Sequence, residues 1–177
     1  MNYAFFDSLS RPEAEDYLHA FLTEIALGFD EMAARAAADG LVLDYSIQTI
    51  APLMLWALPQ LKTVPLPEDL NVSAWIRQTK EYADGLYDFT GSTRILVLRS
   101  AYYFGESFVR EFPQLGWGVG NQDYAEKHMP VVWGFKSRLE LSPLLVSENL
   151  YRRVISDGSK SHSFATAVEY WRRNVEI

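Results

Sequence analysis

The sequence predicts a mainly α-helical (α+β) protein with about six helices and a small antiparallel β-hairpin near residues 115–141. Two observations lead to this class. Apolar residues recur at three- and four-residue spacing over several long stretches, which is typical of amphipathic helices. From residue 131 to residue 141 they alternate instead, which is typical of a strand with one buried face. No repeat or long linker divides the chain, so residues 1–177 are expected to form a single domain.

Two helices are expected in the first third of the chain. Ser10 and Glu13 have the spacing of a capping box, which marks the start of a helix. The apolar repeat that follows predicts a helix over residues 11–38, and Gly40 supplies its stop. The segment from Ile50 to Leu58 is apolar on nearly all sides, which predicts a shorter, buried helix.

A central helix is expected from Ser92 to Phe112. Its apolar residues cover about half of the circumference, so it should pack on two or more neighbours. An extended, proline-containing connector at 61–70 and a helix from Ser73 to Phe89 should precede it. Because the connection around Gly91 is short, the two helices are expected to be antiparallel neighbours.

Beyond residue 112 the sequence predicts a hairpin and then two more helices. A strand at 115–119 should pair with one at 131–141, whose buried face is expected to consist of Val131, Trp133, Phe135, Leu139 and Leu141. A helix opened by Ser142 and Pro143 should point four side chains inward, namely Val146, Leu150, Val154 and Ile155. A last helix, capped by Ser163, should bury Phe164, Ala167, Val168, Trp171 and Val175.

Charge and composition restrict the class of partner. The formal net charge is −7, so the protein repels phosphate backbones at long range, and nucleic acid is not expected as a partner. The chain has no cysteine, which excludes disulfides and thiolate metal sites. No apolar run is long enough to span a bilayer, and no signal-peptide pattern is present. A cytoplasmic protein without membrane association is therefore expected.

A polar stripe on the central helix is the first candidate site. Its members are spaced by four, three and four residues, and Trp117 follows beyond the helix; the stripe consists of Arg99, Tyr103, Glu106 and Arg110. Such a stripe could line a small-ligand cleft between the helix 92–112 and the hairpin, with Glu106 as a general base or as the partner of a ligand cation. The structural alternative is an intrahelical Glu106–Arg110 ion pair, and this interpretation is preferred.

Two other motifs give weaker support for a ligand or metal site. The glycines of GWGVGN (residues 116–121) lack the strand–turn–helix context of a nucleotide-binding loop. Asp123, Glu126 and His128 have ligand chemistry, but their spacing matches no established metal motif. No nucleophile motif is present. We therefore assign no catalytic residue, no metal and no cofactor, and the prediction leans away from an enzyme.

Aromatic residues near the hairpin suggest a surface for a partner. Tyr124, Trp133 and Tyr151 flank the predicted hairpin, and a two-stranded sheet leaves an open edge. Open edges recruit strands of other chains, and Tyr and Trp are frequent anchors of protein interfaces. The alternative is that the rings are buried in the core. Another protein is the expected partner, and a homo-oligomer formed through the open edge is possible.

Two fragments also resemble a known pattern. The segment LDYSIQTIAPL (residues 43–53) and the segment AYYFGESFVR (residues 101–110), followed by Trp117, resemble a pattern in small, uncharacterised bacterial helical proteins. Those proteins have an LDYS-x-x-[ST] segment, a Y-x-G-E helix and a following tryptophan. In those proteins a serine is commoner where this chain has Thr49. The resemblance implies a bacterial origin and a helical core. It transfers no catalytic residue.

These observations together favour a binding function. The leading hypothesis is a non-enzymatic protein-binding module of a bacterial cytosol, similar to an immunity protein that occludes a toxin or to an adaptor. The alternative is an enzyme or small-ligand-binding domain with its cleft between the central helix and the hairpin.

Overall fold

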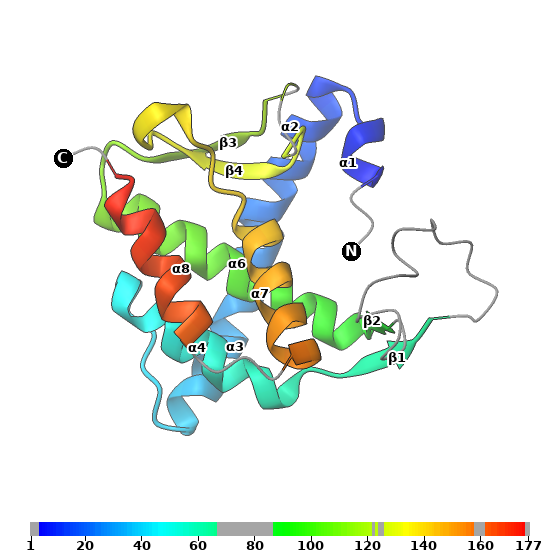
Figure 1. The fold of residues 1–177 in the computed structure, drawn as a ribbon, viewed down its shortest axis with the longest axis vertical. Coiled ribbons are helices and arrows are strands. Elements are labelled where there is room, and N and C mark those ends of the chain that lie inside the picture. Colours follow the sequence, from blue (N-terminus) through cyan, green and yellow to red (C-terminus); the bar gives the residue numbers. More distant parts are fainter. Residues whose placement is uncertain (1–3, 67–86, 122, 124–125, 158–161, 176–177) are drawn as a thin grey trace.

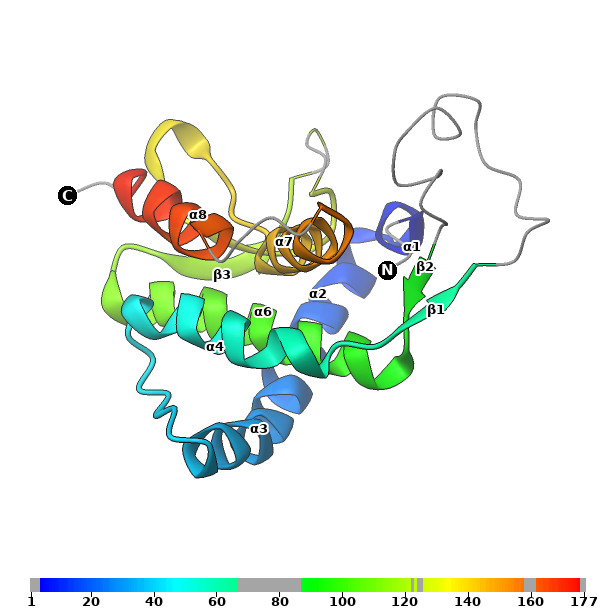
Figure 2. The ribbon, with the colours of Figure 1, turned by 60° about the horizontal axis from the view of Figure 1, so that its bottom comes forward.

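The computed structural model describes residues 4–66, 87–121, 123, 126–157 and 162–175. The predicted mainly helical α+β class is confirmed. Helix α6 (Gly91–Glu111) runs through the middle and contacts α3, α4, α7 and both hairpin strands. Figure 2 shows α3 on the opposite side of α6 from α7. The expected central helix is therefore confirmed to within one residue at each end, and its wide apolar arc packs on several neighbours.

The N-terminal part forms a short helix and a long one. Helix α1 (Ala4–Ser8) is followed by α2 (Arg11–Ala20), a π-helical turn (Phe21–Ile25) and α3 (Ala26–Ala38). The last three are continuous and match the helix predicted over residues 11–38. The capping box is formed, because the Ser10 N–H donates to the Glu13 carboxylate at 2.7 Å.

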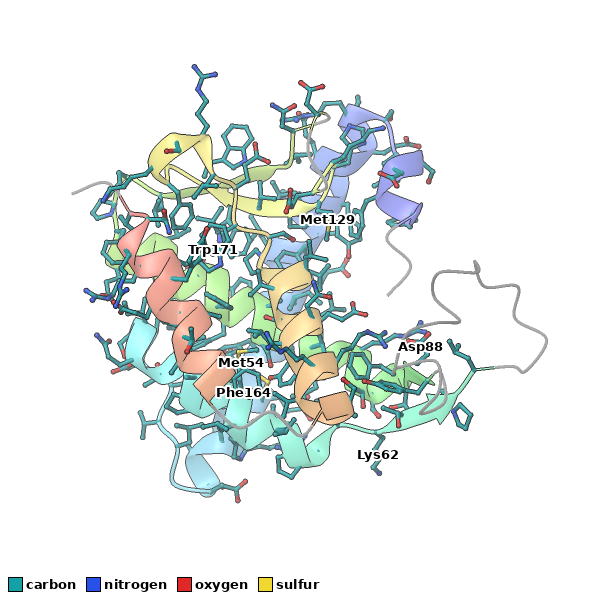
Figure 3. The ribbon with its side chains drawn as sticks, viewed as in Figure 1. Met54, Lys62, Asp88, Met129, Phe164 and Trp171 are labelled. Carbon is teal, nitrogen blue, oxygen red and sulfur yellow. The ribbon has the colours of Figure 1, made fainter. Side chains whose placement is uncertain are left out.

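Helix α4 (Ile50–Ala57) is the most apolar helix and agrees with the prediction to within one residue. One 3-10 turn precedes it (Ile47–Thr49) and another follows it (Leu58–Gln60). Helix α8 packs against α4, and Figure 3 shows Met54 and Phe164 in the region where the two helices meet. Both side chains are fully buried. This contact joins the N-terminal half of the chain to its C-terminus.

A second small sheet was not predicted. Strand β1 (Thr63–Pro65) pairs antiparallel with β2 (Tyr87–Phe89), at the end of α6 where the helix begins (Figure 1). Most of the helix expected from Ser73 to Phe89 lies outside the described residues, but its last three positions are strand, so that part of the prediction is wrong. The aromatic residues at 87 and 89 fit a strand period as well as a helical one, and pairing with β1 decides between the two.

The hairpin is confirmed, although its second strand is shorter than predicted. Strand β3 (Gly116–Val119) pairs with β4 (Pro130–Trp133), and Trp117 lies opposite Val132. The chain turns at Gly134, where φ is +102° and a Cβ would lie 2.4 Å from a backbone oxygen. Leu141 then returns to pair with Val132. The strand predicted to continue to residue 141 is wrong because of this turn.

The predicted alternation of the second strand is confirmed for Val131, Phe135 and Leu141, which are buried, and is wrong for Val132 and Trp133. Val131 and Val132 are both fully buried, whereas the Trp133 side chain is 42% exposed. Strand β4 contacts α6 and α7, and β3 contacts α2. Helices from several parts of the chain therefore cover the hairpin on more than one face, which a period of two cannot encode.

The last two helices are α7 (Pro143–Asp157) and α8 (His162–Arg173). Helix α8 buries Phe164 and Val168 as expected. Helix α7 is rotated relative to the prediction: Val146, Leu150 and Val154 are only partly buried and Ile155 is 37% exposed. The buried side of α7 consists instead of Leu144, Ser147, Glu148 and Tyr151.

An ion network explains this rotation. Glu148 is almost fully buried and accepts a hydrogen bond from Arg152 at 2.8 Å. Arg152 also reaches Asp88 of β2 at 3.3 Å and lies over the Phe89 ring at 4.5 Å from its centroid (Figure 3 labels Asp88). Arg94 binds the other oxygen of Asp88. A buried carboxylate requires such a partner, and the network connects α7 to β2 and to the start of α6.

We expect Arg152→Met to lower the free energy of unfolding by about 3 kcal/mol, because the substitution removes the guanidinium from a buried carboxylate. Urea denaturation measures this change. Arg173→Met, at a side chain that is 76% exposed, is the control and should change stability by less than about 0.5 kcal/mol. The double variant Glu148→Gln/Arg152→Met should recover part of the loss, and equal effects of the two single arginine variants would contradict the role given to the network.

Candidate functional site

The two fragments of the resemblance meet at Tyr103. This side chain is fully buried on α6, and its hydroxyl accepts the Tyr45 N–H at 2.9 Å. The hydroxyl also shares a hydrogen bond with Thr49 Oγ1 at 2.5 Å. The Tyr103 ring stacks on Phe29 of α3, with centroids 5.1 Å apart and planes 13° apart. One tyrosine of the polar stripe thus holds the 43–49 segment against α6 and α3.

The 43–49 segment is also closed by its own side chains. Asp44 accepts a hydrogen bond from the Ser46 N–H at 2.9 Å. Hydrogen bonding by the Ser46 hydroxyl and then by this N–H lowers the pKa of the Asp44 carboxyl. Between them Tyr45 adopts a positive φ of 61°, a conformation that few residues other than glycine adopt readily. The tight turn places the Tyr45 ring 5.0 Å from the Tyr103 ring. The Asp and Tyr of the LDYS pattern therefore have a structural role in this chain.

The glycine and glutamate of the YFGE sequence are explained by Trp117. A Cβ on Gly105 would lie 2.1 Å from Trp117 Cη2, so only glycine allows the indole to lie on α6. The Trp117 Nε1–H then donates to Glu106 Oε2 at 3.1 Å. The ring also packs edge-on against Phe21 at 5.7 Å. Where a ligand cleft between α6 and the hairpin was predicted, the indole of Trp117 contacts the helix directly.

Arg110 completes the set. Its Nε–H donates to Glu106 Oε1 at 2.7 Å, and its guanidinium lies 3.7 Å from the centroid of the Tyr45 ring. The hydrogen bond to Glu106 raises the pKa of Arg110. Both Glu106 oxygens are thereby bound within the protein. We call Tyr45, Tyr103, Gly105, Glu106, Arg110 and Trp117 the aromatic interlock.

The phenols in and beside the interlock have raised pKa values. Burial raises the pKa of the Tyr45 phenol to about 12. Burial also raises the pKa values of Tyr102 and Tyr103, although the hydrogen bonds from Thr49 and the Tyr45 N–H oppose it at Tyr103. A general base requires a pKa close to the working pH. These phenols stay neutral there and act as hydrogen-bonding and packing groups.

Arg99, the fifth predicted ligand residue, lies apart from the interlock. Its guanidinium pairs with Glu31 of α3 at 3.3 Å. It also lies against Gly28, where a Cβ would be 2.7 Å from Arg99 Nη2. Two helical turns separate it from Glu106. The structure therefore brings Tyr103, Glu106, Arg110 and Trp117 together and places Arg99 with α3.

The three predicted partner residues have different surroundings. Tyr124 lies outside the described residues. Trp133 is 42% exposed on β4 and remains available to a partner. Tyr151 is fully buried, and its hydroxyl donates to Ser100 Oγ at 3.0 Å. Tyr151 is thus a core residue and not a surface anchor.

The described residues were compared with the requirements of a metal site and of a membrane-spanning helix. Over these residues no group of three or more His, Asp and Glu side chains is arranged to hold a metal ion. His128 of the 123–128 loop is buried, with its backbone N–H bonded to Gly120. None of the helices described is both long enough and apolar enough to cross a bilayer.

Negative charge is concentrated in residues 1–44, a feature that no sequence motif indicates. Residues 1–44 contain nine carboxylates and two arginines, whereas acids and bases balance over residues 45–177. We define the acidic face as the exposed carboxylates of α2, the π-helical turn and α3, namely Glu13, Glu15, Asp16, Glu24, Asp30 and Glu31. Leu27 lies among them and is 77% exposed. A count of charges by segment would have revealed this surface from the sequence.

Some carboxylates of this face form ion pairs within the protein and others do not. Glu15 pairs with Arg11 and Glu31 with Arg99. No basic side chain in the described ranges pairs with Asp16, Glu24 or Asp30. These three carboxylates therefore keep their charge toward solvent, where a partner can meet it.

Comparisons with protein-family models, with curated proteins and with solved structures find no match for this chain. The bacterial resemblance of the two fragments stays a prediction, and the roles of their residues rest on the geometry described above.

We expect Gly105→Ala to lower the free energy of unfolding by about 3 kcal/mol, because its Cβ would overlap the Trp117 ring. Chemical denaturation monitored by tryptophan fluorescence measures both the loss of stability and the displaced indole. Gly116→Ala is the matched control, since a Cβ there meets nothing within 4 Å and the change should stay within about 1 kcal/mol. Similar destabilisation by both variants would show that the close approach is not limiting.

Tyr103→Phe should destabilise the protein by about 1–2 kcal/mol, because it removes the acceptor of the Tyr45 N–H without changing the ring. The rates of amide hydrogen exchange should increase most at residues 43–49. Tyr170→Phe, at a ring that is 54% exposed, should change stability by less than about 0.5 kcal/mol. Unchanged exchange in the 43–49 segment would contradict the proposed attachment.

Proposed function

We propose that the protein is a non-enzymatic protein-binding module of a bacterial cytosol, an adaptor or an immunity protein, whose acidic face docks on a basic surface of another protein. The observation that carries the proposal is the uneven charge: the first 44 residues hold nine carboxylates and two arginines, and the rest of the chain is balanced. A concentrated charge of one sign steers an oppositely charged partner and rejects surfaces of the same sign.

The unpaired carboxylates support this use of the face. Charges that are already paired inside a protein gain little from a partner, whereas Glu24 and Asp30 can each form a new ion pair on binding. Leu27 lies between them in the chain and offers an apolar contact at 77% exposure. A second copy of this chain is a poor occupant, because its own acidic face would be repelled.

The alternative of an enzyme or small-ligand-binding domain at Glu106 has less support. Both oxygens of Glu106 are bound by Arg110 and Trp117, and Arg110 is half exposed at the surface. A general base or cation-binding group requires an oxygen free for the ligand. The aromatic interlock is therefore better explained as packing that supports the fold.

The experiment compares two double variants in affinity capture from the host. Glu24→Gln/Asp30→Asn removes two charges from the acidic face, and Asp123→Asn/Glu126→Gln removes the same two side-chain types from the hairpin loop. We expect the first pair to weaken binding of a captured basic protein by about tenfold at low salt, and the second to leave it within about twofold. The affinity of the wild-type protein should fall as salt is raised.

Binding kinetics distinguish steering from other causes. The face variant should lower the association rate more than it raises the dissociation rate, because exposed charges act mainly on encounter. If both double variants weaken the complex equally, or if the captured partner is acidic, the proposal fails.

A further inference from the structure

A pocket of about 370 Å³ opens between α3, the start of α6 and the segment that leads into β1. Its chemistry is opposite to that of the acidic face. Three cationic side chains and three apolar ones line it together with one hydroxyl and one amide, namely Arg35, Lys62, Arg99, Met32, Ile95, Leu96, Ser92 and Gln60. No carboxylate belongs to the lining residues described. Like charges around a pocket repel one another unless an anion compensates them, and of these three cations only Arg99 pairs with a carboxylate in the described chain.

Arg99 is held in place from two sides. Its side chain is only 20% exposed, pairs with Glu31 at 3.3 Å and lies against Gly28. Glu31 is itself 72% exposed and lies outside the pocket lining, so it orients the guanidinium without filling the pocket. A guanidinium that is fixed before binding loses less entropy when it meets a planar oxyanion.

The other two cationic residues, Lys62 and Arg35, form hydrogen bonds with uncharged groups. The backbone of Lys62 is clamped to α6, since its N–H donates to Thr93 Oγ1 at 2.7 Å and its carbonyl accepts from the same hydroxyl at 2.9 Å. Within the described chain no carboxylate pairs with its ammonium, and Figure 3 shows the side chain extending away from the ribbon. Arg35 donates to the neutral Gln60 at 2.7 Å.

The helix itself adds to the positive potential. Ser92 lines the pocket and is the second residue of the 21-residue helix α6. The first-turn N–H groups of a helix carry partial positive charge and bind anions. Between Ser92 and Arg99 on the same stripe of α6, Ile95, which is 49% exposed, and Leu96 offer an apolar surface.

We propose that this pocket binds a small organic anion, a phosphate or carboxylate group attached to a short apolar chain or ring. The oxyanion lies among Arg35, Lys62, Arg99 and the α6 N-terminus, and the apolar part lies on Ile95 and Leu96. The volume is that of a small-molecule site. The proposal is independent of the acidic face and of the partner that binds there.

Titration of the full chain with phenyl phosphate, benzoate and inorganic phosphate, followed by amide NMR at constant ionic strength, tests the pocket. We expect saturable shifts at Lys62, Gly91 and Ser92, with phenyl phosphate or benzoate binding more tightly than inorganic phosphate. Absence of saturation with all three probes would overturn the proposal. Equal affinity for inorganic phosphate and phenyl phosphate would overturn the apolar half of the site.

Two variants separate the pocket from general electrostatic attraction. Lys62→Gln should weaken phenyl phosphate roughly tenfold, as expected for the loss of one charge-assisted contact. Lys136→Gln removes the same charge at an exposed lysine beside α8 and should leave the affinity unchanged. Equal weakening by the two variants would show only a diffuse effect of net charge and would overturn the assignment.

A charge-conserving variant tests the geometry. Gly28→Ala adds a Cβ that would lie 2.7 Å from Arg99 Nη2, so the guanidinium must move, while alanine is well tolerated in a helix. We expect phenyl phosphate to bind several-fold more weakly with thermal stability retained. Unchanged affinity in this variant would remove Arg99 from the site.

Discussion

The close approach of Trp117 to Gly105 is the constraint on which the surrounding structure depends. Because α6 has no side chain at that position, the indole lies on the helix and presents its N–H to Glu106. Glu106 in turn orients Arg110, which covers the ring of Tyr45. Through this series of contacts the hairpin, the central helix and the 43–49 segment are held together, and both oxygens of Glu106 are bound within the protein.

Two regions of opposite charge, the acidic face and the cationic pocket, lie on neighbouring elements. Helix α3 presents two carboxylates of the acidic face, Asp30 and Glu31, and the same helix contributes Arg35 to the cationic pocket. The Glu31–Arg99 pair lies between the two, since Glu31 belongs to the acidic face and Arg99 lines the pocket. The pair uses one exposed carboxylate to orient Arg99, and Glu31 itself lies outside the pocket lining. A protein partner and a small anion would thus bind to adjacent but chemically different surfaces.

The sequence predicted the positions of the helices better than it predicted which side of each helix is buried. The long helix over residues 11–38 and the central helix were correct, because caps and three- to four-residue spacing act within a few turns. The buried side of α7 was wrong, since Glu148 is buried through its contacts with Arg152, and Arg152 with β2. The candidate site shows the same limit. Arg99 shares a stripe with Glu106 in the sequence, yet its partner lies 68 residues away on α3.

Local spacing by itself determined the helical class, the caps, the central helix and the presence of the hairpin. Composition determined the total charge. The tertiary structure decided that Tyr103 is a fully buried hydrogen-bond acceptor, that Trp117 fills the space next to Gly105, and that Tyr151 belongs to the core. It also decided that Arg35, Lys62 and Arg99 share one pocket. The physical reason is that periodicity reports interactions between residues three or four apart, whereas these contacts join residues from 12 to 64 positions apart, whose pairing depends on how the elements pack.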